Sequence, residues 1–238
     1  MKRIIQPALL LVTLAFAVAP AFTPSFRGYD PGTFPVQIEN PSVQPAGYAF
    51  AIWGLIYLWL IAHAAFGLMK RRGDPAFVKP AVPLTLSVVL GTVWLAIAVA
   101  SPIPAAVAII AMAAFAIYAY VIADPAQDPW LLSAPLAIYA GWLTAASAVS
   151  TGVILAGYGI LPDTGAALMM LGLVLIIGIA MQIKRPNLPI YGATIVWAII
   201  GIVVKSWGVN PTVGYAAIVG AVVMALVTLA QLRRPTAQ

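Results

Sequence analysis

Long apolar stretches alternate with short polar interruptions along the chain. Crossing a hydrocarbon core of roughly 30 Å takes about 20 apolar residues in a helix, and the stretches are of about that length. The pattern therefore predicts an all-α polytopic membrane helix bundle with about eight transmembrane helices. We expect these helices at residues 4–22, 48–69, 82–100, 103–122, 131–156, 164–183, 188–206 and 211–232.

The sequence SPIP at residues 101–104 separates the third and fourth predicted spans. Without a break there, one helix over residues 82–122 would be about 60 Å long, twice the thickness of the hydrocarbon core. Pro102 and Pro104 suit a tight turn followed by a helix start. We therefore expect two helices here.

Basic residues gather in loops on one side of the predicted bundle. Lys and Arg in short loops collect on the cytoplasmic side of a membrane. With eight spans and the N-terminus inside, only Arg27 and Lys205 lie outside. The predicted cytoplasmic set is Lys2, Arg3, Lys70, Arg71, Arg72, Lys79, Lys184, Arg185, Arg233 and Arg234. This asymmetry predicts cytoplasmic N- and C-termini. It also places residues 23–47 outside, as a candidate lid or a plain connecting loop.

The composition agrees with a membrane protein, since 63% of the 238 residues are hydrophobic and 8% are charged. Average soluble domains carry roughly a quarter charged residues. The net charge of +6 follows from the basic loops and indicates contact with anionic lipid, so no nucleic-acid partner is expected. The chain has no cysteine, which excludes disulfides and thiolate metal sites. Residues 1–22 also resemble a signal peptide, so removal of this segment is an alternative to a retained first span.

The acidic residues all lie in predicted loops or at span ends. They are Asp30, Glu39, Asp74, Asp124, Asp128 and Asp163. Proton relays and ion-coupled carriers usually place carboxylates inside the membrane, so their absence there disfavours such mechanisms. Carriers with broken helices remain an alternative. The sequence contains no HExxH motif or phosphate-binding glycine loop, and its one histidine has no buried acid partner. We expect no catalytic residues and no enzyme activity.

Two features were considered as metal or haem sites. Asp124 and Asp128 share a Pro-containing loop, but with no further ligand nearby they make a poor metal pair, and no metal site is predicted. His63 is the single histidine. It is interpreted either as an axial haem ligand or as a hydrogen-bonded packing residue, and the packing interpretation is favoured.

Aromatic side chains lie deep in several predicted spans. Trp53 and Tyr57 share one helix face, and Tyr57 is too far from the helix end for an interfacial belt. Trp94, Tyr139 and Trp142 repeat this placement in the third and fifth spans. An indole N–H or phenol hydroxyl at this depth needs a polar partner or a polar ligand. The rings therefore wall an apolar ligand pocket, or they are ordinary helix packing with local backbone acceptors, and both interpretations stay open here.

Four segments together resemble the TspO/MBR family of tryptophan-rich sensory proteins and translocator proteins. They are PAGYAFAIWGLIYL at 45–58, LGTVW at 90–94, the fourth apolar span and PLAIYAGWLTAASAVST at 135–151. Trp53 with Tyr57, and Tyr139 with Trp142 and Thr144, match the family's positions. The chain departs from the family at Gly91 and Ser150, where asparagine is usual. The resemblance implies a five-helix bundle over residues 1–156, with residues 157–238 as an additional three-helix segment.

The resemblance also implies a function. The family binds flat hydrophobic ligands, such as porphyrins, other tetrapyrroles and sterol-like molecules, for sensing, regulation or transport. The expected ligand-binding residues are Trp53, Tyr57, Trp94, Tyr139, Trp142 and Thr144. No cofactor is required, and a porphyrin or haem-type ligand is possible, as is a homodimer or a larger membrane complex. The expected location is the bacterial inner membrane. The alternatives are a transporter of apolar or neutral solutes and a structural subunit of a larger complex.

Overall fold

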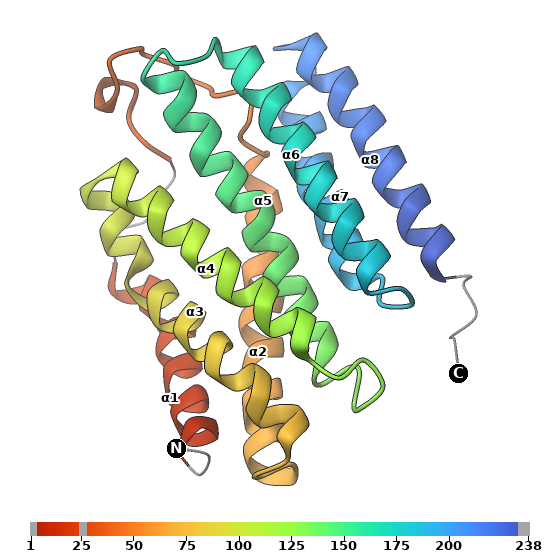
Figure 1. Ribbon diagram of the computed structural model, residues 1–238. Coiled ribbons are helices and arrows are strands. Elements are labelled where there is room, and N and C mark those ends of the chain that lie inside the picture. Colours follow the sequence, from red (N-terminus) through yellow and green to blue (C-terminus); the bar gives the residue numbers. More distant parts are fainter. Residues whose placement is uncertain (1–3, 24–27, 233–238) are drawn as a thin grey trace. The chain divides into compact units, whose positions relative to one another are not determined.

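The computed structural model describes residues 4–23 and 28–232, and every regular element in these ranges is a helix (Figure 1). The α-helices are α1 (Ile5–Val18), α2 (Ile52–Lys70), α3 (Pro75–Ala100), α4 (Pro102–Ile122), α5 (Ser133–Gly157), α6 (Asp163–Lys184), α7 (Ile190–Ser206) and α8 (Pro211–Leu232). Short 3-10 helices occupy Ala19–Phe22 (η1), Pro31–Thr33 (η2) and Gly47–Ala51 (η3). The prediction of an all-α bundle is confirmed. Five basic residues used to predict the orientation, Lys2, Arg3, Arg27, Arg233 and Arg234, lie outside the described residues.

Most of the helices are long and apolar enough to cross a membrane. Seven candidate spans meet this criterion among the described residues, and α7 is shorter, with 17 residues. At 1.5 Å per residue α7 is about 26 Å long, slightly less than a hydrocarbon core. Large apolar side chains point outward, for example Leu58 on α2, Ile176 on α6 and Val219 on α8. Such side chains suit a helix surface that faces lipid.

The helix α3 begins at Pro75, so the predicted start at residue 82 is wrong. Asp74 caps the helix, because its carboxylate oxygen accepts a hydrogen bond from the backbone N–H of Ala76 at 3.0 Å. Pro75 occupies the first turn, where a missing N–H costs nothing. Asp followed by Pro is a helix-start signal, but the charged residues around it led us to expect a loop. Lys79 therefore lies on α3.

The break between α3 and α4 falls at Ser101, as the SPIP sequence predicts. Ser101 is extended, with φ −162° and ψ 133°, and Pro102 opens α4. Helix α4 packs against α3. Its buried residues are largely alanines, including Ala105, Ala113 and Ala116, and small side chains let two helices approach closely.

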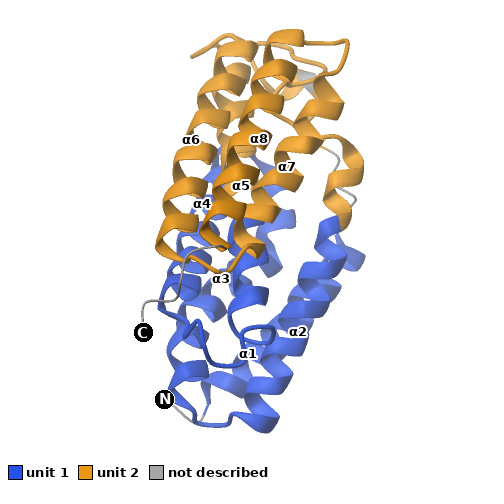
Figure 2. Cartoon of the chain, turned by 90° about the vertical axis from the view of Figure 1, so that its right-hand side faces the viewer, with its two compact units in different colours: residues 1–27, 52–143 blue, residues 28–51, 144–238 orange. Residues whose placement is uncertain are grey.

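The chain forms two compact units (Figure 2). Unit 1 comprises residues 1–27 and 52–143, and unit 2 comprises residues 28–51 and 144–238. In unit 1, α1 packs against α2 and α3. In unit 2, α6, α7 and α8 pack against one another, and η3 packs against α7. The boundary falls inside α5, whereas the domains predicted from the resemblance divide at residue 156, and that division stays a prediction.

The described part of the predicted outer loop belongs to unit 2, where it packs closely against glycines of the helices. The backbone N–H of Val36 donates to the carbonyl of Gly157 at 2.8 Å, and the ring of Phe34 covers the same glycine. Further along, the N–H of Ala46 donates to the carbonyl of Gly201 at 2.9 Å. A Cβ atom at Gly201 would lie 2.8 Å from Cβ of Pro45. The segment 28–51 is therefore anchored to α5 and α7 by close backbone contact.

Candidate functional site

Five aromatic rings of unit 1 form a continuous group, called here the ring cluster. Its members come from α1, α2 and α5, and they are Phe16, Trp53, Tyr57, Tyr139 and Trp142. Four of them were predicted as ligand-binding residues. The structure therefore brings together rings that lie far apart in the sequence, and it adds Phe16, which the sequence analysis did not select.

Trp53 and Tyr57 form the half-buried part of the ring cluster. They lie one turn apart on α2, and their rings stack with centroids 5.4 Å apart and planes inclined by 22°. Both side chains are intermediate in exposure. They sit within the 24-residue apolar span Gly47–Lys70, and Tyr57 is near its middle. No residue that the structure describes forms a hydrogen bond with the Trp53 indole N–H or the Tyr57 hydroxyl.

Tyr139 and Trp142 form the buried part of the cluster, with 0% and 2% of their surfaces exposed. The ring of Trp142 meets that of Trp53 edge to face, with centroids 6.2 Å apart and an angle of 84°. The Tyr139 hydroxyl lies 3.0 Å from Oγ of Ser87, which is itself 2.8 Å from the carbonyl of Met112. Because a carbonyl only accepts, the serine proton goes to Met112 and the tyrosine hydroxyl donates to Ser87. This chain of bonds fixes Tyr139 against α3 and α4.

Phe16 lies among the other rings and is 4% exposed. Its centroid is 5.8 Å from Trp53, 5.0 Å from Tyr57 and 6.0 Å from Tyr139, and all three pairs meet edge to face. Such geometries are the favoured ones for aromatic pairs. Phe16 therefore joins α1 to the walls supplied by α2 and α5.

Gly91 of α3 makes room for Phe16. A Cβ atom at position 91 would lie 2.6 Å from Cε2 of Phe16 and 3.1 Å from Cε of Met112. This is the position at which the family resemblance leads one to expect asparagine. In this chain the residue is glycine, and the Phe16 ring fills the space beside it. An apolar ring therefore takes the space in which a polar asparagine side chain was expected.

The other two predicted ligand-binding residues, Trp94 and Thr144, each form a hydrogen bond to a neighbouring helix. The indole N–H of Trp94 donates to the carbonyl of Ala105 at 2.9 Å, which ties α3 to α4. Trp94 lies almost one helical turn after Gly91. The hydroxyl oxygens of Thr144 and Tyr191 lie 2.7 Å apart inside unit 2, and Thr144 is 5% exposed. Within unit 2, Thr144 of α5 is thus bonded to α7.

His63 lies on α2 in a buried setting. Its Nδ1 is 2.7 Å from the carbonyl of Leu131, so this nitrogen carries the proton and donates. Its ring stacks on Phe77 with centroids 5.6 Å apart. The side chain is 1% exposed. These contacts agree with the packing interpretation of His63.

The two aspartates once considered as a metal pair hold the loop before α5. Asp124 accepts hydrogen bonds from the backbone N–H groups of Ala126 and Gln127. Asp128 forms an ion pair with Arg71 at 2.8 Å, and this bond with Asp128 raises the pKa of the arginine. Within the described ranges, no group of three or more His, Cys, Asp or Glu side chains is placed to hold a metal ion.

Sequence reasoning missed Phe16 and Ser87. Phe16 is buried together with Leu9 and Thr13 along one face of α1, but an almost uniformly apolar helix hides such a face from hydropathy analysis. Ser87 is one of the few polar residues inside α3. A hydroxyl in the middle of an apolar helix was a usable signal, because a buried polar group is normally hydrogen-bonded.

Comparison with known families identifies a match over almost the whole chain. The model of a family described as TSPO-like protein matches residues 3–230. This confirms the family resemblance seen in the motifs of α2, α3 and α5. The match also extends over α6, α7 and α8, beyond the first 156 residues that carried the resemblance. No curated protein and no solved structure matches the chain.

Proposed function

We propose that the ring cluster of this chain, which belongs to the TSPO-like protein family, binds a flat hydrophobic ligand. The chain is an integral membrane protein. The ligand class is a porphyrin or another tetrapyrrole, with sterol-like molecules as the second candidate. Binding serves sensing or regulation in a bacterial inner membrane, where both termini face the cytoplasm.

One observation carries this proposal. Trp53 and Tyr57 stack on each other near the middle of an apolar span, yet their side chains are only half buried. Neither the indole N–H nor the phenol hydroxyl is hydrogen-bonded to any residue in the described part of the chain. Polar groups at that depth need a partner. A ligand with a flat apolar body and a polar edge supplies both a stacking surface and the missing acceptors.

The rest of the ring cluster keeps this face rigid. Tyr139 and Trp142 are buried behind Trp53, and Phe16 contacts both Trp53 and Tyr57 edge to face. Rings held in this way lose little conformational freedom when a ligand stacks on them, so more of the dispersion energy appears as affinity. The hydrogen-bonding tips of Trp53 and Tyr57 then orient the ligand.

Quenching of tryptophan fluorescence by protoporphyrin tests the proposal. We expect saturable quenching in the purified protein and a loss of most of the quenched component in Trp53→Phe, since the ligand stacks on this half-buried ring. Trp207→Phe is the matched control, because Trp207 is 71% exposed in unit 2. Quenching that does not saturate, or that falls equally in both variants, would contradict the proposal. Porphyrin flux into liposomes would show whether binding is coupled to transport.

A further inference from the structure

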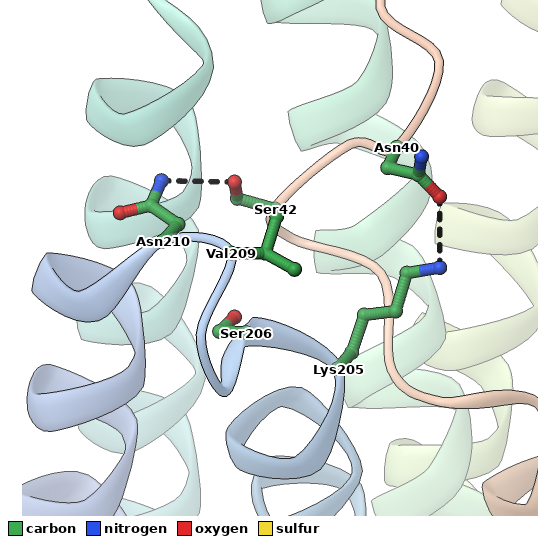
Figure 3. Close-up of a pocket in the computed structure, with 6 residues that line it drawn as sticks. All are labelled: Asn40, Ser42, Lys205, Ser206, Val209 and Asn210. Carbon is green, nitrogen blue, oxygen red and sulfur yellow. Dashed lines mark hydrogen bonds between the residues drawn. The ribbon is translucent and has the colours of Figure 1, made fainter.

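A small polar cavity lies in unit 2 where the turn between α7 and α8 meets the segment 40–42 (Figure 3). It has a volume of about 140 Å³. Its lining consists of polar side chains and one valine: Asn40, Ser42, Lys205, Ser206, Val209 and Asn210. A cavity of this size compares with the ~150 Å³ engineered cavity that holds benzene, so it has room for a small molecule or a headgroup.

Ser206 at the end of α7 carries a buried hydroxyl that faces this cavity. The residue is 2% exposed, and its hydroxyl has no hydrogen-bond partner among the described residues. Two other buried hydroxyls on the helices of unit 2 are hydrogen-bonded within their own helices. Thr194 and Thr228 each donate to the carbonyl four residues earlier, at 2.7 and 2.8 Å. Ser206 departs from this pattern, and in Figure 3 it lies between the Lys205 side chain and the Ser42–Asn210 pair.

Most side-chain acceptors around the cavity already take part in hydrogen bonds. The carboxylate of Asp163 accepts from both the N–H and the hydroxyl of Ser42. Oγ of Ser42 in turn accepts from the amide of Asn210 at 3.0 Å. The Asn210 carbonyl oxygen accepts from the N–H of Val213 at 3.3 Å. These bonds leave the polar side chains of the cavity with few free acceptors.

Donors, by contrast, are in surplus. The Lys205 ammonium has three N–H donors, and one of them goes to Oδ1 of Asn40 at 2.9 Å. Because that oxygen accepts, the amide nitrogen of Asn40 keeps its own donors for another group. No carboxylate among the described residues pairs with Lys205, and Glu39, next to Asn40 in the chain, is exposed. The start of α8 just after Asn210 adds a partial positive charge.

We propose that this cavity binds an oxyanion, either the carboxylate or phosphate of a small solute or the phosphate of a lipid headgroup. Lys205 neutralises the charge, and the Ser206 hydroxyl and Asn40 amide donate hydrogen bonds to the oxygens. Both oxygens of the Asp163 carboxylate accept from Ser42, and among the described residues Asp163 forms no ion pair with Lys205. This site lies in unit 2 and takes a polar ligand, so it is independent of the ring cluster.

Chemical protection of Lys205 tests the proposal in the full-length protein. Acetylation by acetic anhydride is followed peptide by peptide in dodecyl maltoside micelles, which carry no phosphate, with Lys184, an exposed residue of the same unit, as the internal reference. Titration with succinate or inorganic phosphate, at constant ionic strength maintained with chloride, forms the first arm. Titration with phosphatidylglycerol, added to the micelles without a soluble anion, forms the second arm.

We expect saturable slowing of Lys205 acetylation in one arm while the rate at Lys184 stays constant. Ser206→Ala should raise the concentration needed for half protection about tenfold, since it removes a hydrogen bond to a charged group. The same variant should melt like the wild type, because the hydroxyl has no partner within the described protein. Protection in the first arm identifies a soluble anion, and protection in the second alone identifies a lipid phosphate. The proposal is overturned if chloride protects equally, if Ser206→Ala changes nothing, or if neither arm protects Lys205.

Discussion

The two units hold their functional side chains by different physical means. In unit 1 the ring cluster is joined by edge-to-face and stacked aromatic contacts. In unit 2 the segment 28–51 is held by hydrogen bonds, such as those from Ser42 to Asp163, and by close contact with glycines of α5 and α7. Ring contacts are many and individually weak, whereas each hydrogen bond here depends on one donor and one acceptor.

This difference explains what each unit leaves available. A cluster of rings presents broad faces and a few polar tips, as Trp53 and Tyr57 do, and such a surface suits a flat apolar ligand. A network that uses up its acceptors leaves donors, as at Lys205 and Ser206. The two regions should therefore respond to different substitutions and to different ligands.

The largest expected effect comes from removing the carboxylate that anchors the loop of unit 2. Asp163→Ala leaves the N–H and hydroxyl of Ser42 without their acceptor, and Ser42 is 7% exposed. We expect a loss of about 3 kcal/mol in stability, measured by thermal or denaturant unfolding in detergent. Asp124→Ala is the control, because that exposed carboxylate only caps a surface turn. Equal losses in both variants would contradict the anchoring role of Asp163.

The second prediction concerns the glycine that seats the same segment. In Gly201→Ala the new methyl would lie 2.8 Å from Cβ of Pro45 and 3.0 Å from Cβ of Ala49, neither of which can swing away. We expect a net loss of about 1–2 kcal/mol and faster proteolysis within residues 28–51. Gly172→Ala, whose added Cβ meets no side chain or other segment of the described chain within 4 Å, should be neutral or slightly stabilising. If the two variants are cleaved at the same rate, the close contact at Gly201 is not what holds residues 28–51 against α7.

The third prediction applies the same substitution to unit 1. Gly91→Ala pushes on the Phe16 ring, whose end is able to shift, so we expect a smaller loss of about 1 kcal/mol. The change should alter tryptophan fluorescence, because Phe16 touches Trp53. Adding Phe16→Leu should recover part of the stability of Gly91→Ala, as expected for two residues in contact. Gly54→Ala serves as the control, because a Cβ at Gly54 would meet no other segment of the described chain within 4 Å. Purely additive effects of Gly91→Ala and Phe16→Leu would argue against a contact between these two residues.

The smallest expected effect is a pH dependence at Tyr29 in unit 2. Burial raises the pKa of Tyr29 from 10.0 to about 12. The phenol of Tyr29 therefore loses its proton at lower pH when residues 28–51 are unfolded than when they are folded. The contribution of the protonated, buried Tyr29 to the free energy of unfolding is fully present below pH 10. It is lost as the pH rises towards about 12. In Tyr29→Phe this part of the decline in melting temperature should disappear, and an unchanged profile would contradict the burial of the phenol.

Much of the fold could be predicted from the sequence, because hydropathy and helix-breaking residues act locally. The break at Ser101 follows from proline chemistry alone. The early start of α3 needed more weight on Asp74 and Pro75 than on the charges around them. The grouping of helices into two units, and the seating of residues 28–51 on Gly157 and Gly201, depend on long-range packing and were not accessible from local patterns.

The part of the candidate site that lies on one helix was predictable from helical periodicity. Trp53 and Tyr57 lie four residues apart, and that spacing places them on one face. Their pairing with Trp142 came from the order of family motifs. The role of Phe16 follows from the empty space beside Gly91, and only the folded chain shows which residue fills it. The Ser206 hydroxyl has no hydrogen-bond partner in the described ranges, and this too becomes visible only when its neighbours are known.

The central claim is that the exposed face of the ring cluster binds a flat hydrophobic ligand. Its most direct test is a Soret-band titration of protoporphyrin with the wild type and with Trp53→Leu and Tyr57→Leu, in nanodiscs of constant composition. Trp130→Leu, which removes an exposed ring from the same unit, is the matched control. The account predicts saturable binding that weakens about tenfold or more in each α2 variant and stays unchanged in the control. Equal affinity in all four proteins would contradict it.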